Sequence, residues 1–149
     1  VTFSGLGAYS DYKHLQIRSV ARVDVSGTTC AMRFNSDSGS NYARHYLIGS
    51  GSVSSGGQTS QDQSNTLFAA GSSQAANIFG VSVVDILDFA STNKNTTVRS
   101  LVTNSDGTII LFSGLWNDTA AITSIEIKQQ TTGNFVSGSR FSIYGTKGA

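Results

Sequence analysis

Few residues in this chain have the types and spacing that catalysis requires. Asp85 and Asp88 form the only close carboxylate pair in an apolar stretch, and Glu126 is the only glutamate. Glycoside hydrolysis needs two carboxylates that face each other across the substrate. Residues three apart on a strand point to opposite faces, so this pair does not predict a hydrolase. We expect Asp88 to bond the loop backbone near Asn93, or Asp85 to pair with an arginine.

The remaining candidates for chemistry are two histidines and one thiol. His14 and His45 stand at no spacing typical of a metal site. Cys30 is the single cysteine, so no intrachain disulfide forms, and it shares a strand face with Met32 and Phe34. This setting predicts a buried thiol rather than a nucleophile. No Gly-x-Ser-x-Gly elbow occurs between a strand and a helix. The sequence therefore predicts no enzyme, no bound metal and no cofactor.

One group of aromatic residues could bind a ligand. Trp116, with Tyr42, Tyr46 and Asn117, could form a surface on which a sugar ring stacks beside an amide donor. Trp116 follows Leu115 near the end of a strand, and the alternative is that its ring belongs to the core or to an interface. We keep these four residues as the candidate contact for a ligand or partner.

The segment Asn35–Asn41 resembles a calcium loop at first sight. An EF-hand loop needs glycine at its sixth position and a distant glutamate. Gly39 is fifth from Asn35 and no such glutamate follows. We instead predict a hairpin turn in which Gly39 supplies the positive φ. The segment Asn104–Gly107 has the same turn chemistry.

The segments that carry these residues have the sequence patterns of β-strands. Alternation is clear in the last third of the chain, where Ile125 and Ile127 oppose Glu126 and Lys128. Three strand-like runs lie within 104–145. Earlier strands are predicted at 12–25, 28–34, 42–49, 66–70, 78–89 and 97–102, with a short piece near Val1 and Phe3. The nearly uncharged Gly/Ser-rich stretch 50–65 is predicted as a long loop and as the best loop for a partner contact.

Composition supports one all-β domain over residues 1–149. Proline is absent, sixteen glycines serve the turns, and 38% of residues are hydrophobic. We predict an antiparallel, jelly-roll-like β-sandwich of about eight to ten strands. Charged residues make up only 13% and the net charge is +1, without a basic cluster, so no nucleic-acid partner is expected. No apolar run approaches ~20 residues, so no membrane insertion is expected. The initial Val leaves open a processed start or a longer parent chain.

Several stretches carry a resemblance to a known family. They are 12–18, 33–42, 83–101, 113–116, 120–127 and 134–148. Together they resemble β-rich structural proteins of tailed bacteriophages, notably of marine and cyanobacterial phages. The resemblance covers most of the chain and implies no catalytic residues.

The expected function follows from this resemblance and from the weakly charged, Ser/Thr-rich composition. We expect a non-enzymatic protein of the virion surface, a capsid decoration or head-fibre element, that assembles with copies of itself, as a homotrimer, and with other virion proteins. The absence of a heptad or repeat region favours the head over a fibre shaft. The alternatives are a receptor-binding tail-fibre domain, in contact with a host surface glycan, and a carbohydrate-binding module.

Overall fold

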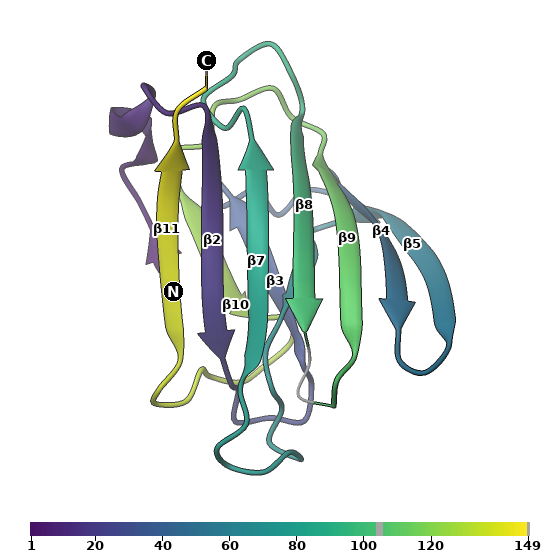
Figure 1. The fold of residues 1–149 in the computed structure, drawn as a ribbon. Helices are drawn as coiled ribbons and strands as arrows, with labels where there is room; N and C mark the ends of the chain where they lie inside the picture. Colours follow the sequence, from purple (N-terminus) through teal and green to yellow (C-terminus); the bar gives the residue numbers. More distant parts are fainter. Residues whose placement is uncertain (104–105, 149) are drawn as a thin grey trace.

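The computed structural model describes residues 1–103 and 106–148. Asn104 and Ser105, in the turn predicted at 104–107, lie outside these residues. The described chain is almost entirely strand (Figure 1), with one short 3-10 helix, η1 (Leu6–Tyr9). The strands are β1 (Thr2–Phe3), β2 (His14–Ala21), β3 (Thr29–Phe34), β4 (Tyr42–Gly49), β5 (Val53–Gln61), β6 (Ser64–Phe68), β7 (Gly80–Leu87), β8 (Thr96–Thr103), β9 (Ile109–Trp116), β10 (Ile125–Gln129) and β11 (Arg140–Thr146). The predicted all-β class is confirmed, with eleven strands in the described chain.

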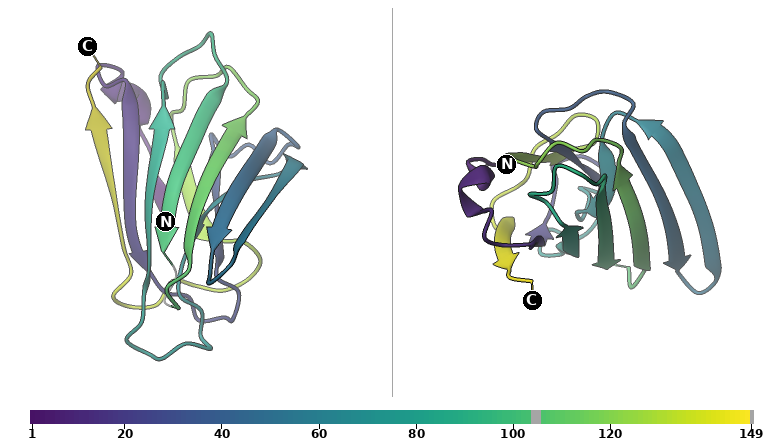
Figure 2. Two further views of the ribbon diagram at one scale, coloured as in Figure 1. Left: turned by 45° about the vertical axis from the view of Figure 1, so that its right-hand side comes forward. Right: turned by 90° about the horizontal axis from the view of Figure 1, so that it is seen from above.

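The strands form two antiparallel sheets packed face to face. The smaller sheet has the order β1-β10-β3-β6, and the larger has the order β11-β2-β7-β8-β9-β4-β5. Figure 1 looks onto the outer face of the larger sheet, with β11 at its left edge and β5 at its right edge, and the smaller sheet lies behind it. Seen from above in Figure 2, β4 and β5 extend sideways past the smaller sheet. The predicted sandwich is therefore confirmed, with sheets of unequal width.

Alternating side chains fill the space between the sheets. β8 and β9 bury every second residue without exception, as a strand with one core face does. The largest fully buried side chains come from both sheets and from two loops; they include Trp116, Tyr42, Phe34, Phe89, Ile17, Met32, Leu67, Ile86, Ile122, Ile125 and Ile127. Ile122 belongs to the loop before β10, because β10 begins at Ile125.

The predicted strand at 12–25 is shorter in the structure. β2 ends at Ala21, where the chain leaves the sheet, and Arg22 turns its guanidinium into the loop before β7. The Arg22 nitrogens donate to the carbonyl oxygens of Ala75 at 2.8 Å, Gln74 at 2.7 Å and Ile78 at 3.1 Å. The last residues of the predicted strand, from Arg22 on, are therefore not part of β2. The buried Arg22 guanidinium instead satisfies several loop carbonyls.

The prediction of a long loop at 50–65 is wrong. Val53–Gln61 forms β5, which pairs with β4, and β6 begins at Ser64. β5 is exposed on both faces along most of its length, so it has no apolar alternation by which it could be recognised. The ladder of backbone hydrogen bonds to β4 forms it.

The predicted hairpin turn at 35–41 is also wrong. β3 belongs to the smaller sheet and β4 to the larger one, so this segment crosses between the layers. The left-handed backbone is taken by Asn35 (φ 52°) and Ser36 (φ 61°) and not by Gly39. Asparagine tolerates this region better than most residues, and the Asn35 side chain bonds the segment before β10 through Ala121 and Thr123.

Candidate interaction surface

The structure does not place the four residues that the sequence grouped as a ligand contact together on one surface. Tyr42 and Trp116 are each 1% exposed, and Tyr46 is half-buried. Only Asn117 lies in the open, where its carbonyl oxygen accepts from the Asn95 amide at 2.8 Å. The rings of Tyr42 and Trp116 stack on each other inside the sandwich, with centroids 6.4 Å apart. The expected sugar-stacking surface is therefore wrong for these two rings, because both serve the core.

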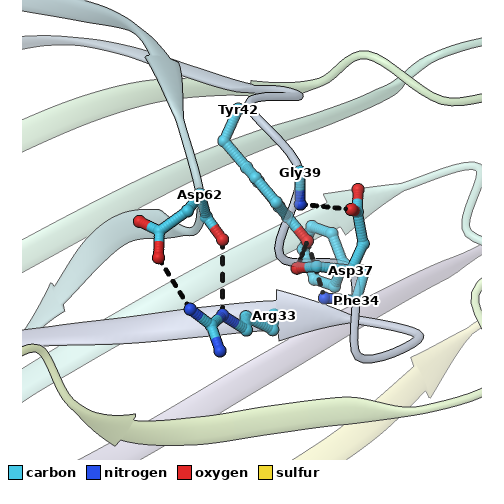
Figure 3. A network of polar contacts seen from close by, with 6 residues as sticks. All are labelled: Arg33, Phe34, Asp37, Gly39, Tyr42 and Asp62. Carbon is cyan, nitrogen blue, oxygen red and sulfur yellow. Dashed lines mark hydrogen bonds and ion pairs between the residues drawn. The ribbon is translucent and has the colours of Figure 1, made fainter.

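Polar groups fix these two rings at the crossing between the sheets. Figure 3 shows Tyr42 with Phe34, Asp37 and Gly39 at this place. The Trp116 indole N–H donates to the Asp37 carboxylate at 2.7 Å, and the backbone N–H of Gly39 donates to it at 2.8 Å. The Tyr42 hydroxyl accepts from the N–H of Phe34 at 3.0 Å and donates to the Asp37 carbonyl at 3.3 Å. Burial raises the pKa of the Asp37 carboxyl, but these hydrogen bonds outweigh it and leave the pKa lowered. The cluster is structural.

A second ion pair lies beside this cluster. In Figure 3 the Arg33 guanidinium of β3 contacts Asp62, with 2.7 Å between Nη2 and Oδ2. Asp62 lies in the short connection from β5 to β6, which is the other crossing between the sheets at this place. Both crossings are thus held by a carboxylate.

The carboxylates considered for catalysis are used in separate ion pairs. Asp85 pairs with Arg99 at 3.0 Å, which confirms the predicted arginine partner. Asp88 contacts Lys94 at 2.5 Å and His14 at 3.7 Å, rather than the backbone near Asn93. The hydrogen bond from Lys94 lowers the pKa of the Asp88 carboxyl. The two carboxylates do not share one site.

Cys30 and the metal-ligating residues offer no reactive centre in the described residues. Cys30 is buried in β3, and burial raises the pKa of its thiol to about 12. Within 1–103 and 106–148, no three His, Cys, Asp or Glu side chains come close enough to hold a metal ion.

The most unusual surface is the outer face of the seven-stranded sheet. Eight large apolar side chains on this face are between 38% and 82% exposed. We call this set the apolar outer face; it consists of Val20, Leu47, Val53, Val81, Leu101, Ile109, Leu111 and Leu115. They make up most of the exposed large hydrophobic side chains of the described chain. Monomeric soluble proteins rarely expose contiguous apolar patches of more than a few hundred Å².

Strand register makes this surface continuous. Val83 lies opposite Leu101, Leu101 opposite Leu111, and Leu111 opposite Leu47, so one apolar row crosses four strands. A neighbouring row pairs Val20 with Val81 at one side of the sheet. Directly opposed side chains on one face are about 4.5–5.5 Å apart at Cβ, so the row has no polar break.

Two shallow hollows lie on the same face. One of about 560 Å³ lies over β4, β5 and β9, between His45, Leu47, Leu111 and Ser113. The other, of about 380 Å³, lies over β7, β8 and β9 and includes Val83 and Leu101. Leu111 borders both hollows, so it stands as a ridge between them.

The charges of this face are few, and they include one ion pair. Arg99 and Asp85 neutralise each other, and the Arg18 guanidinium lies 5.1 Å from the centre of the Tyr144 ring. The outward residues of the seven strands, as far as the structure describes them, include arginine, histidine and tyrosine but neither lysine nor glutamate. Protein interfaces show this same enrichment in arginine and aromatic residues and depletion of lysine and glutamate.

An aromatic cleft lies at the β11 edge of the sandwich, on the side away from β5. It has a volume of about 480 Å³ and opens between β1, η1 and β11, where Phe3, Tyr9, Tyr12 and Tyr144 line it with Thr2 and Ser4. No charged side chain lines it among the described residues. Sequence reasoning missed this cleft because its residues come from both ends of the chain.

The apolar outer face could have been recognised in part from the sequence. In β8 and β9, apolar residues occur on both alternating faces, as in Leu101 beside Val102 and Leu111 beside Phe112. A strand with two apolar faces is typical of burial on both sides.

Comparisons with family models, curated proteins and solved structures gave no match for this chain. In the parts of the chain that the structure describes, no helix has the length and hydropathy needed to span a bilayer.

Proposed function

We propose that this chain is a non-enzymatic structural protein of the surface of a tailed-phage particle, a head decoration or head-fibre element, that associates with copies of itself. The phage setting rests on the resemblance of the sequence. The single observation that supports an assembly role is the apolar outer face of the seven-stranded sheet. Its occupant is a second copy of this chain, packed sheet against sheet.

The size of the face suits a stable contact. Seven strands about 4.8 Å apart and about eight residues long, at about 3.4 Å per residue, cover roughly 900 Å². Stable interfaces bury about 800 Å² on each partner. A second sheet packs at about 10 Å from the first, so side chains from a copy fill the two hollows that flank Leu111.

The apolar content of the face is also sufficient. Full burial of one aliphatic side chain contributes roughly 1.5–3 kcal/mol, so covering the exposed half of these eight contributes roughly 6–12 kcal/mol per copy. Association costs an estimated 4–15 kcal/mol in lost freedom of motion. Two copies together exceed most of this range.

Sedimentation velocity over a concentration series tests the assembly role. The wild-type chain is expected to form a discrete homo-oligomer. Its mass distinguishes the dimer that one sheet-against-sheet contact builds from the trimer that the resemblance implies. The variant Leu101→Gln/Leu111→Gln removes the centre of the apolar row without opening the core, because both side chains point to solvent. It is expected to sediment as a smaller species with an unchanged circular dichroism spectrum. A wild-type chain that stays monomeric at millimolar concentration would contradict the proposal.

Quantitative mass spectrometry of purified particles tests the placement. Hundreds of copies per virion are expected for a head protein. A few copies would place the chain on the tail, and none would exclude a virion role.

A second candidate function, carbohydrate binding, is favoured by the aromatic cleft. Tyrosine rings offer apolar faces, the hydroxyls of Thr2 and Ser4 offer hydrogen bonds, and the lining carries no charge, which suits a neutral sugar. Tyr9 is 55% exposed at this cleft. A glycan array tests this candidate: binding that is lost in Tyr9→Ala supports it, and an array without signal contradicts it.

A further inference from the structure

The four sheet edges of the described chain differ in how their backbone is protected. β1 is only two residues long, and β11 carries Arg140 at its start and is followed by Lys147. Short length and positive charge are the usual devices that keep an edge strand from pairing with another chain. These two edges are therefore protected.

β6, the third edge, is covered by side chains from the opposite sheet. The Ser100 hydroxyl donates to the carbonyl of Thr66 at 2.7 Å, and Arg44 donates to the carbonyl of Asn65. The Ser82 hydroxyl bonds the backbone of Phe68 at 3.3 Å. The backbone of β6 thus finds its partners within the fold.

β5, the fourth edge, has none of these devices over most of its length. The segment Val53–Gln58 contains no charged residue and no proline, and it is paired with β4 along one side only. No side chain of the described residues bonds the backbone of Val53–Gln58; the Gln61 amide donates to the Thr59 carbonyl, beyond this segment. A register shift in the pairing with β4, together with the positive φ of Ser60 (54°), interrupts the strand only near its end. The open edge is therefore Val53–Gln58, with about half of its backbone N–H and C=O groups directed outward.

Two aromatic side chains of β4 lie against the faces of β5 at Gly56 and Gly57, and not along its outer edge. A Cβ on Gly56 would meet the Tyr46 hydroxyl at 2.5 Å, and one on Gly57 would meet the His45 ring. The two rings thus lie against opposite faces of the strand, and a side chain at either position would have to displace the ring it meets. With these rings on its faces, β5 remains accessible along its outer edge, beyond the smaller sheet (Figure 2).

We infer that the Val53–Gln58 edge pairs antiparallel with the same segment of a second copy, so that two seven-stranded sheets become one continuous sheet. Among protein partners, an extended strand is the one that pairs with a whole row of outward backbone groups. The segment is self-complementary, because two uncharged runs of Ser, Gly and Gln meet without opposed like charges or bulky side chains. A strand with charged side chains would find no opposite charge within Val53–Gln58 with which to pair. The inference deepens the proposed self-association by adding a contact separate from the apolar outer face.

Hydrogen exchange of the full chain, read by mass spectrometry at low and high protein concentration, tests this pairing. The outward amides of 53–58 are expected to exchange at least roughly tenfold more slowly in the assembled state, since they gain hydrogen bonds. Ser54→Lys places one positive charge per copy beside the two-fold contact and is expected to raise the concentration for this protection roughly tenfold. Ser54→Thr, at the same exposed position, keeps the edge uncharged and is expected to behave as wild type.

Two results would overturn the inference. One is that the wild-type chain assembles but the amides of 53–58 gain no protection from exchange. This is also the result expected if the edge pairs only with a different protein. The other is equal protection in Ser54→Lys and Ser54→Thr. A failure of the proposed function is distinguishable, because it appears as an unchanged oligomer in Leu101→Gln/Leu111→Gln, whatever the exchange at 53–58.

Discussion

Removal of the Asp37 carboxylate is expected to destabilise the sandwich at the crossing between its sheets. Asp37→Ala takes away the acceptor of the Trp116 indole N–H, at 2.7 Å, and of the Gly39 and Asn41 donors. Gly39 lies on an exposed loop and can bond water instead, whereas the Trp116 side chain is fully buried. A hydrogen bond to a charged group contributes roughly 1.5–3 kcal/mol, and an unsatisfied buried donor costs a similar amount. We therefore expect a loss of about 3 kcal/mol in the free energy of unfolding.

Urea unfolding followed by tryptophan fluorescence measures this loss, because Trp116 is the only tryptophan. With a slope of about 2 kcal/mol per molar urea, the midpoint falls by about 1.5 M. Asp118→Ala is the matched control, since that carboxylate accepts one backbone N–H, from Ala120 at 2.8 Å, and its loss is expected to cost less than about 1 kcal/mol. Equal midpoints for the two variants would refute the reasoning.

Three further predictions concern stability and reactivity. The pKa of the Asp37 carboxyl is lowered in the fold, so the stability difference between wild type and Asp37→Asn should be constant at neutral pH and shrink as the pH falls below about 4; a difference that grows in acid in urea titrations would contradict this. Cys30 should react with a thiol reagent only at the rate of unfolding, since its pKa is raised to about 12 and it is buried, and rapid labelling of the native chain would disprove its burial. Arg22→Met should lower the free energy of unfolding by about 3 kcal/mol, because it leaves the carbonyls of Gln74, Ala75 and Ile78 without their donor; thermal melts that show no shift would refute that role.

Alternation of apolar residues was enough to predict most strands and the sandwich. Strands such as β7 and β8 bury every second residue, so their local pattern indicates the core directly. β5 could not be predicted in this way, because both of its faces are exposed and its sequence is that of a loop. Its strand geometry comes from β4, and only the three-dimensional arrangement shows that partner.

The local sequence also could not predict to which of the two sheets a strand belongs. The segment between β3 and β4 has the composition of a hairpin turn, but these strands do not pair with each other. β3 pairs with β10 and β6, and β4 pairs with β9 and β5. The position of Trp116 was more accessible. It shares the buried face of β9 with Ile110, Phe112 and Gly114, and this spacing indicates a core ring rather than a ligand platform.

The most direct measurement of the central claim is carbene footprinting of the native chain at low and high concentration. If a second copy covers the apolar outer face, labelling of Leu47, Leu101 and Leu111 should fall severalfold in the assembled state. Labelling of Tyr9, at the far aromatic cleft, should stay the same. Equal labelling of the three leucines at all concentrations, with an assembled species present, would show that the face remains open and would contradict the account.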